Sequence, residues 1–374
     1  MRGHVDIYAG YYSEPAPTGI ADYGILNDSG TVTAYTEAAT AVTGTAVIDS
    51  LQSTIPNPPQ GSSPNGAGLQ LNVVMQVNTT ASSYDYWLQN TVTFYTNNDT
   101  FYYVSNVWNY SSPTASMITH DTAGLGSISP SGNQSFYGYA TNETGYTLPL
   151  ALEIPINVSY SGDAVRASFS YLQAQGGASL AGAPSRYDMV TITEPQQVLS
   201  AVILVTGKEY TPSQNYFDSE LDFGGDANGA NATFTAMQAV LNMSYLLTDG
   251  HTALPPSVYG FGGDTAEAAT NLQTSQVGGQ FVVTIGTEDF QTSFVPTSSS
   301  TSSTSTAGTS SASSAQAAST SASNTTTYAS ATSAAGGIPE FPSGGLAVAL
   351  LAVALAGSYF VVRRRALSAG PPRG

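Results

Sequence analysis

Apolar and polar residues alternate along much of this chain, and the alternation is clearest in segment 69–77, LQLNVVMQV. Every second residue of that segment is apolar, whereas Gln70, Asn72 and Gln76 share the other face with Val74. A period of two with β-branched residues is typical of a β-strand that is buried on one face. We therefore expect a half-buried strand here.

Further strands are predicted on both sides of turn signals. Segments 84–96 and 100–111 continue the alternation, and the polar cluster Thr96–Asp99 is typical of a turn, so these strands form an antiparallel meander. Frequent turns, with no long amphipathic helix before residue 340, favour an all-β fold of antiparallel β-sandwich or barrel-like subdomains. Five later segments also read as strands: 164–172, 187–194, 200–207, 239–247 and 279–287.

Composition divides the chain into five parts. A boundary between two β subdomains is expected at Ser161, and after residue 296 the sequence is almost wholly Ser, Thr, Ala and Gly. Such a tract cannot bury a core and predicts a flexible stalk. The predicted parts are an N-terminal β subdomain (1–160), a C-terminal β subdomain (161–296), the stalk (297–337), a membrane anchor (338–366) and a short cytoplasmic tail (367–374).

The anchor is predicted from residues 344–362, which are uncharged and mostly apolar. Roughly 20 such residues in a helix span a bilayer. Arg363, Arg364 and Arg365 follow at once, and the positive-inside rule places them in the cytoplasm. We therefore expect a single-pass cell-surface protein with an extracellular N-terminal region. The opening MRGHVDIYAGYY has no long apolar core, so a leader peptide is expected to be missing from the recorded sequence.

Charge is scarce and mostly negative. Only 9% of the residues are charged, against about 25% in ordinary globular proteins. Acids outnumber Lys and Arg by 25 to 8, which argues against binding to nucleic acid. A surface built from uncharged polar groups changes little when Asp and Glu are protonated, so an acidic medium is a sensible hypothesis.

An exposed region of this composition also offers sites for glycans. Asn-x-Ser/Thr sequons are acceptors for glycosylation in secreted proteins. Their number suits a glycosylated ectodomain. They begin at Asn27, Asn78, Asn98, Asn109, Asn133, Asn142, Asn157, Asn231, Asn242 and Asn324.

Several kinds of catalytic site are excluded or unsupported. The chain has no cysteine, so disulfides and thiolate metal sites are impossible. His4, His120 and His251 are scattered and match neither a zinc motif nor a serine-hydrolase elbow. No phosphate-binding glycine loop is present, and we expect neither a metal nor a cofactor. The remaining chemistry is that of paired carboxylates, which activate water when one is protonated and the other is ionised.

Three acidic stretches with neighbouring glycines stand out: EPAPTGIADYGI (14–25), SELDFGGDANG (219–229) and YGFGGDTAEAATN (259–271). Each also has a structural interpretation. Asp22 fits a turn, and Asp226 fits a solvated hairpin loop. Asp264 and Glu267 have the spacing of a capping box that opens a short helix. A calcium loop at Asp222 and Asp226 lacks regular ligand spacing.

A further acid, Asp28, lies in NDSG and superficially matches the catalytic loop of pepsin-like proteases. That type of site needs two copies of the loop and only one is present. We therefore interpret these residues as a turn.

The three stretches, together with LQLNVVMQV, YDYWLQNTVTF and VSNVWNYSS, resemble in the same order the thermopsin family of archaeal acid peptidases. The resemblance spans roughly residues 11–275. It implies an endopeptidase that is secreted or held at the cell surface, that works in hot acid with aspartic-type behaviour, and that has no known metal requirement.

The resemblance also marks residues for the site. Asp22 falls in its G-I-A-D-Y-G stretch, Glu220 ahead of its G-G stretch, and Asp264 and Glu267 in its D-T-A-E stretch, whereas Asp226 sits where no acid is expected. Our hypothesis is that Asp22 shares a proton with Asp264 or Glu220 in a cleft.

Aromatic residues are candidates for walls that bind an extended peptide. These are Tyr23, Trp87, Trp108 and Tyr110, although packing in the core is the more common role for residues such as the two tryptophans. A β-rich peptidase would recognise its protein or peptide substrate by strand addition at a sheet edge.

The sequence therefore predicts an acid endopeptidase at the cell surface, which hydrolyses peptide bonds with water activated by a carboxylate. Two other functions remain open at this point. One is a non-catalytic coat protein or adhesin on the same scaffold. The other is a glycan hydrolase, because two carboxylates also serve that chemistry.

Overall fold

A computed structural model describes residues 15–28, 31–112, 114–207, 217–263, 265–288 and 293–295. All the regular structure in these ranges is β-strand, which confirms the all-β prediction for this part of the chain. None of the described residues forms a helix of the length and hydropathy that crossing a membrane requires. The predicted stalk (297–337), anchor (338–366) and tail (367–374) lie outside the described residues.

Most strands belong to one large sheet, which forms two layers joined through β15 (Val198–Thr206). β15 pairs with β5 at its start and with β4 at its end, and so links the layers. The first layer contains, in order of pairing, β19 (Val258–Phe261), β1 (Thr18–Asp22), β16 (Ser219–Gly224), β5 (Gly66–Thr79), β6 (Ser83–Tyr95), β7 (Thr100–Asn109) and β10 (Gln134–Ala140).

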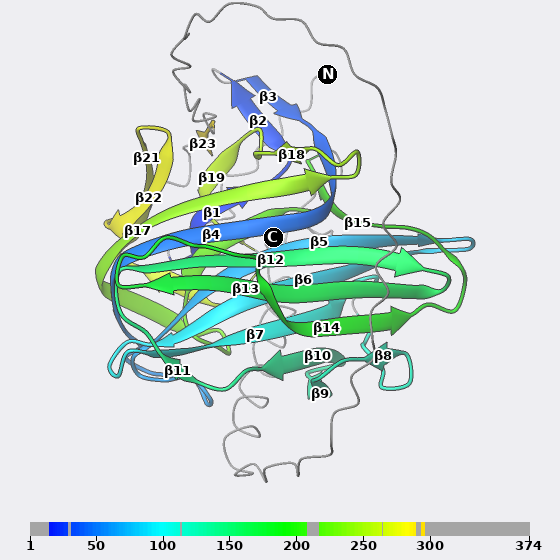
Figure 1. The fold of residues 1–374 in the computed structure, drawn as a ribbon, viewed down its shortest axis with the longest axis horizontal. Helices are drawn as coiled ribbons and strands as arrows, with labels where there is room; N and C mark the ends of the chain where they lie inside the picture. The colour runs from blue at the N-terminus through cyan, green and yellow to red at the C-terminus, as the bar shows by residue number, and fades with distance from the viewer. Residues whose placement is uncertain are drawn as a thin grey trace, which may run out of the picture. The chain divides into compact units, whose positions relative to one another are not determined.

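The second layer is antiparallel as well, and its strands β4, β12, β13 and β14 run side by side across Figure 1. It contains β22 (Gln280–Ile285), β17 (Asn231–Leu247), β4 (Thr36–Thr54), β12 (Leu150–Ser161), β13 (Ala164–Gln175) and β14 (Ser185–Thr193). Shorter strands complete the edges: β2 (Ile25–Asp28), β3 (Thr31–Ala34), β8 (Thr122–Ala123), β9 (Ser127–Ser131), β11 (Thr144–Gly145), β18 (Thr252–Ala253), β20 (Ala268–Thr270), β21 (Leu272–Val277) and β23 (Ser293–Phe294).

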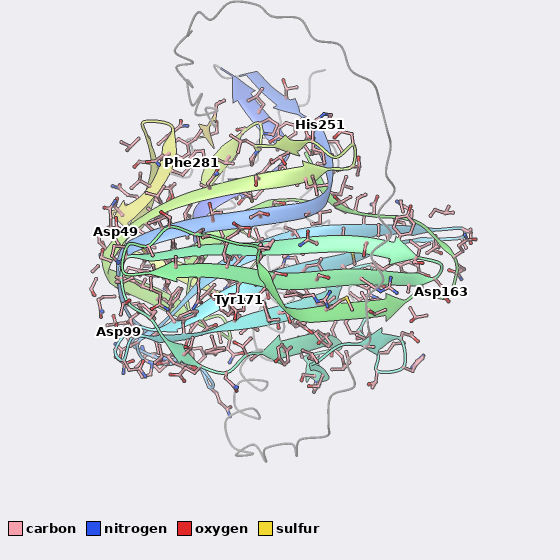
Figure 2. All side chains as sticks on the ribbon, in the orientation of Figure 1. Asp49, Asp99, Asp163, Tyr171, His251 and Phe281 are labelled. Carbon is pink, nitrogen blue, oxygen red and sulfur yellow. The ribbon has the colours of Figure 1, made fainter. Side chains whose placement is uncertain are left out.

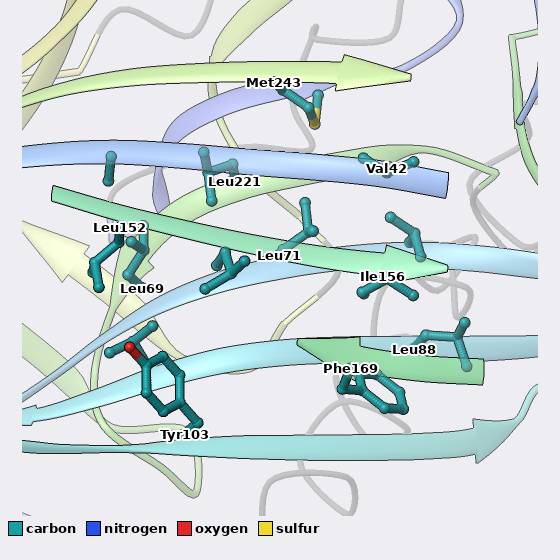
Figure 3. Packing of buried hydrophobic residues seen from close by; sticks show 14 of the residues in the cluster. Val42, Leu69, Leu71, Leu88, Tyr103, Leu152, Ile156, Phe169, Leu221 and Met243 are labelled. Carbon is teal, nitrogen blue, oxygen red and sulfur yellow. The ribbon is translucent and has the colours of Figure 1, made fainter. Parts of the chain in front are cut away.

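The main core lies between the two layers. Inward residues of β5 and β6, such as Leu71 and Leu88, belong to the same buried cluster as Ile156 and Phe169 of the second layer (Figure 3). Burying an aliphatic or aromatic side chain of this size contributes about 1.5–3 kcal/mol. The apolar faces that the alternation predicts therefore pack against each other and hold the two layers together.

Two aspartates mark turns at opposite ends of the strands. Asp99 lies in the turn between β6 and β7, and Asp163 lies between β12 and β13 (Figure 2). The β6–β7 turn was predicted at Thr96–Asp99, and Asp99 takes the left-handed backbone conformation there, with φ 52°. The turn predicted at Asp28 also fits, because β2 and β3 form a hairpin in which Asp28 pairs with Thr31.

One part of the β5 prediction was wrong. The alternation predicted a strand buried on one face, but Gln70 and Asn72 on its polar face are also buried, with exposed fractions of 3% and 0%. The outer face of the first layer therefore carries buried polar side chains. A buried polar face is informative, because polar groups are normally buried only with partners.

The helix predicted at residues 265–271 was also wrong. This segment contains β20, which pairs in parallel with the start of β17. The carboxylate of Glu267 accepts hydrogen bonds from the Gly229 N–H and the Thr265 hydroxyl and caps no helix. Pairing with β17 overrides the local spacing.

All described residues lie in one compact unit. Strands from both sides of Ser161 share the large sheet, since β12 ends there and pairs with β13. The division into subdomains 1–160 and 161–296 stays a prediction.

A candidate active site on the outer face of the first layer

The pairing of β1 with β16 separates two of the predicted acids. Asp22 lies opposite Ser219, whereas Glu220 lies opposite Ala21. Residues directly opposite in a sheet point to the same side, and neighbours along a strand point to opposite sides. Asp22 therefore faces the core between the layers, and Glu220 faces the outer side. The structure does not bring this predicted pair together.

Asp22 is fully buried and accepts three hydrogen bonds. The Tyr35 hydroxyl donates to Oδ1 at 2.5 Å and the Gly24 N–H donates to Oδ1 at 2.8 Å, while the Tyr245 hydroxyl donates to Oδ2 at 2.7 Å. Burial raises the pKa of Asp22 to about 6, and these three bonds partly offset the rise. Gly24 has φ +67°, which agrees with the turn expected here.

Glu220 comes instead beside Asp222, an acid that the prediction did not place in the site. The two are two residues apart on β16, so their side chains share the outer face, and both are fully buried. A Cβ on Gly262 would overlap Asp222 Oδ2 and lie 2.9 Å from Glu220 Oε2. Both carboxylates therefore meet beneath the backbone of Gly262.

Gly263, the residue after Gly262, is hydrogen-bonded to the carboxylate pair. The Gly263 N–H donates a 2.6 Å hydrogen bond to Glu220 Oε1, and the Tyr23 hydroxyl lies 3.5 Å from the same oxygen. Gly262 itself is held by its N–H, which donates to the Pro17 carbonyl at 2.9 Å. Only glycine lets the backbone approach the carboxylates this closely.

Glu267 extends the row of acids along β16. It is 5% exposed, and its Cβ lies 3.1 Å from where a Cβ on Gly224 would be. Gly224 follows Asp222 by two residues, so Glu267 covers the next position on the same face. The predicted Asp264 lies outside the described residues, directly after Gly263 in the sequence.

The residue that sequence reasoning missed could have been found from spacing. The tripeptide Glu220-Leu221-Asp222 alternates acid, apolar, acid, which on a strand places both acids on one face. Asp and Glu are depleted in strands, so the segment does not read as one by composition. Pairing with β1 and β5 on both sides makes it one.

The predicted substrate-binding aromatics lie on the same outer face, in two groups. Trp87 stacks on Tyr110 with 5.6 Å between ring centroids, and Trp108 stacks on Phe136 at 4.5 Å. Together with Val74 and Ala266 these residues form a second apolar cluster, separate from the main core. Tyr23 lies 5.7 Å from the ring of Tyr259 and 5.9 Å from that of Phe261.

Asp226 differs from the prediction. It was expected in a solvated loop but is only 7% exposed, and it accepts hydrogen bonds from the Ser62 hydroxyl and, at 2.6 Å, from the Ser63 N–H. Burial raises its pKa to about 6, while these bonds act in the opposite direction. Its role is to hold the 62–63 loop against the start of β5.

No group of His, Asp and Glu within the described ranges has the arrangement of a metal site. The only described arginines, Arg166 and Arg186, lie on β13 and β14 in the second layer. The outer face of the first layer thus offers carboxylates, amides, hydroxyls and aromatic rings. These groups can move protons and bind neutral polar ligands.

Comparison with known proteins gives two matches. The family model described as Thermopsin matches residues 3–272. A curated relative, thermopsin of Sulfolobus acidocaldarius, is 36% identical over 288 residues, which cover 76% of this chain and 84% of the relative. Both matches include β16, which carries Glu220 and Asp222, and the glycines Gly262 and Gly263.

Proposed function

The chain belongs to the thermopsin family, and on that premise we propose that it is a peptidase of the thermopsin type whose reacting carboxyl pair is Glu220 and Asp222. One observation carries the choice of residues: both side chains are fully buried on one face of β16 and meet beneath Gly262. Two carboxylates so close cannot both ionise easily, so the pair holds one proton.

In the proposed reaction the ionised carboxylate takes a proton from a water molecule. The water oxygen bonds to the carbonyl carbon of the scissile peptide, and the protonated carboxyl stabilises the developing oxyanion. Transfer of a proton to the peptide nitrogen then breaks the C–N bond and releases an acid and an amine. No acyl-enzyme forms, and this is the aspartic type of peptidase chemistry.

A peptide must reach a pair that is fully buried. We propose that the backbone at Gly262 and Gly263 moves aside to admit it. Within the described ranges, these glycines are held by one hydrogen bond to Pro17 and one to Glu220. Asp264 and Glu267 remain predicted contributors to the pair. Tyr23, Trp87, Trp108 and Tyr110 remain predicted contacts for side chains of the substrate.

The proposed location is the cell surface. The apolar residues 344–362 with Arg363–Arg365 behind them support an anchor, and the sequons support glycans on the part outside the cell. Labelling of intact cells with a membrane-impermeant reagent tests this. Labelling of the 15–295 region only after lysis would exclude it.

Substitution of the acids by their amides tests the assignment. E220Q and D222N should each lower kcat/KM for peptide cleavage near pH 3 by about 10²–10⁴-fold, the range for loss of a general acid or base. D22N is the matched control, because Asp22 is as buried as Glu220 but faces the core. It should keep most of the activity.

Other outcomes have definite meanings. Loss of activity in D22N with full activity in E220Q and D222N would move the site to Asp22, whose raised pKa and two tyrosine partners suit an acid–base group. Absence of peptide cleavage by the unmodified protein from pH 1 to 7 would favour the coat-protein or adhesin function. Cleavage of oligosaccharides alone would favour the glycan hydrolase.

A further inference from the structure

Beside the carboxylate pair, a row of amide side chains crosses the first layer. Glu220 on β16 lies opposite Asn72, Asn72 opposite Gln89, and Gln89 opposite Asn106. Opposed residues share a face, so one acid and three amides form a straight line over four strands on the outer side. Gln70 lies in the adjoining line, opposite Asp222.

Hydrogen bonds orient this row. Asn106 Nδ2 donates to Gln89 Oε1 at 3.1 Å, and Gln89 Nε2 donates to Gln70 Oε1 at 2.9 Å and to Asn72 Oδ1 at 3.0 Å. The bonds use one polar atom of Asn72 and one of Asn106. A donor, Asn72 Nδ2, is left at the end beside Glu220, and an acceptor, Asn106 Oδ1, is left at the other end; neither has a partner among the described residues.

Two more buried polar atoms on the same face are also without a hydrogen-bond partner among the described residues. Thr91 Oγ1, in the line of Asp222 and Gln70, and Trp108 Nε1 have no hydrogen-bond partner within the described ranges. Asn72, Asn106, Thr91 and Trp108 are 0%, 4%, 4% and 2% exposed. A buried donor or acceptor without a partner is unfavourable, so a ligand that forms hydrogen bonds with several of them gains free energy on binding.

On the inner face of β6, in contrast to the outer row, a buried amide finds all its hydrogen-bond partners within the protein. Asn90, next to Gln89, donates from Nδ2 to the Pro155 and Ser170 carbonyls, both at 2.9 Å, and its Oδ1 accepts from the Tyr187 hydroxyl at 2.9 Å. The amide that joins the two layers is therefore satisfied within the protein. The outer row is satisfied only in its middle.

We infer that the row of Gln70, Asn72, Gln89 and Asn106, with the Thr91 hydroxyl beside it, binds the backbone of the substrate peptide. A peptide backbone has N–H donors and carbonyl acceptors in regular alternation. A backbone N–H of the substrate fits the acceptor Asn106 Oδ1, and a backbone carbonyl fits the donor Asn72 Nδ2, which places that carbonyl beside Glu220. Amides stay neutral in acid, so this contact is kept where carboxylates are protonated. The inference rests on the proposed peptidase function.

A double-mutant cycle between protein and substrate tests the inference. The substrates are a peptide that the full-length protein cleaves and ester analogues in which successive backbone N–H groups are replaced by oxygen. At one position the ester should lower kcat/KM about tenfold, the equivalent of one hydrogen bond of about 1.4 kcal/mol. In Asn106→Leu the same ester should cause no further loss.

Two other variants separate binding from folding. Thr91→Val keeps the shape and removes a hydroxyl without a partner in the described part of the protein, so its melting temperature should not fall, while KM rises several-fold. Asn90→Leu on the inner face should lower the melting temperature and leave the ester effect unchanged.

Equal loss for every ester in wild type and Asn106→Leu, with an unchanged KM in Thr91→Val, would overturn the inference. If the parent peptide is still cleaved and E220Q still lowers kcat/KM as expected, the proposed function stands without the inference. If the parent peptide is not cleaved at all, the proposed function fails first and the inference fails with it.

Discussion

The buried acids of this protein accept hydrogen bonds from neutral groups. Few basic side chains surround them. Asp188, 1% exposed, accepts from the Ser105 hydroxyl at 2.6 Å, from the Tyr137 hydroxyl at 3.0 Å and from the Met189 N–H at 2.8 Å. Hydroxyl and amide donors satisfy the oxygens of a buried carboxyl group without a basic partner. Such groups suit a protein with 8 Lys and Arg residues in 374.

The hydrogen bond between Tyr35 and Asp22 allows the contribution of such a neutral donor to be tested. Tyr35→Phe removes the hydroxyl that donates to Asp22 Oδ1 at 2.5 Å. A bond to an ionised carboxylate contributes about 1.5–3 kcal/mol and one to a neutral partner about 0.5–1.5 kcal/mol. The variant should therefore lose more unfolding free energy at pH 7, above the pKa of about 6, than at pH 3. Urea denaturation at both pH values measures the difference.

Tyr103→Phe is the control for this change. The Tyr103 hydroxyl donates at 2.7 Å to Gln173 Oε1, an amide that does not titrate. Its loss should be the same at pH 3 and pH 7. An equal loss at both pH values for Tyr35→Phe as well would mean that Asp22 does not change its charge over this interval.

At the scale of elements, strands whose alternation is local were predictable and strands formed by pairing were not. The segments 69–77, 84–96 and 100–111 match β5, β6 and β7 to within three residues at each end. β16 has two acids in six residues, and β1 is only five residues long; neither has a signal of its own. Each becomes a strand because it pairs on both sides.

The candidate site was likewise predictable only in part. The sequence marked the stretches that contain Asp22, Glu220 and Glu267 but could not give the register between β1 and β16. That register puts Asp22 on the inner face and brings Asp222 beside Glu220. A shift by one residue would exchange the two faces, so the composition of each strand cannot decide the pair.

The close approach of Gly262 to the carboxylates of β16 leads to a prediction at the scale of elements. In Gly262→Ala the new methyl group would overlap Asp222 Oδ2 and press on Glu220 Oε2. Both carboxylates must move, and displacement of reacting groups by about 1 Å can lower the rate about 10²-fold. We expect kcat to fall by at least that factor, with a loss of about 1–3 kcal/mol in unfolding free energy from overpacking.

Gly145→Ala is the matched control, because a Cβ there would meet only the Asp99 carbonyl at 3.9 Å, an ordinary contact. It should leave both activity and stability near those of the wild type. Full activity in Gly262→Ala would show that the carboxylates can shift without effect on the reaction, which argues against their role as the reacting pair.

At the scale of the whole molecule, burial of acids links folding to pH. Asp22 and Asp226 have pKa values of about 6 in the folded protein against 3.8 in the unfolded state. The folded state therefore binds more protons than the unfolded state between these values, so stability falls as pH rises from about 4 through 6. Glu194, whose pKa is also raised by burial, acts in the same direction.

The expected size of this effect follows from the two shifts. At about 1.4 kcal/mol for each pKa unit, the two aspartates together reduce the unfolding free energy by on the order of 5 kcal/mol between pH 3 and pH 7. For a protein of this size such a loss lowers the melting temperature by roughly 10 °C. Calorimetry of the full-length protein at pH 3, 5 and 7 measures the decline, most of which should lie above pH 4.

The double variant D22N/D226N separates this cause from general charge repulsion. An amide is neutral at every pH and has almost the shape of the protonated acid, so the variant should lose much of the decline between pH 4 and pH 7. The other acids still give the protein a negative charge, and repulsion among them would remain. Asp249→Asn, on an exposed turn, removes one charge without changing a buried group, and its melting curve should follow the wild type. If the double variant declines as steeply as the wild type, the pH dependence comes from surface charge, and burial of Asp22 and Asp226 is not its origin.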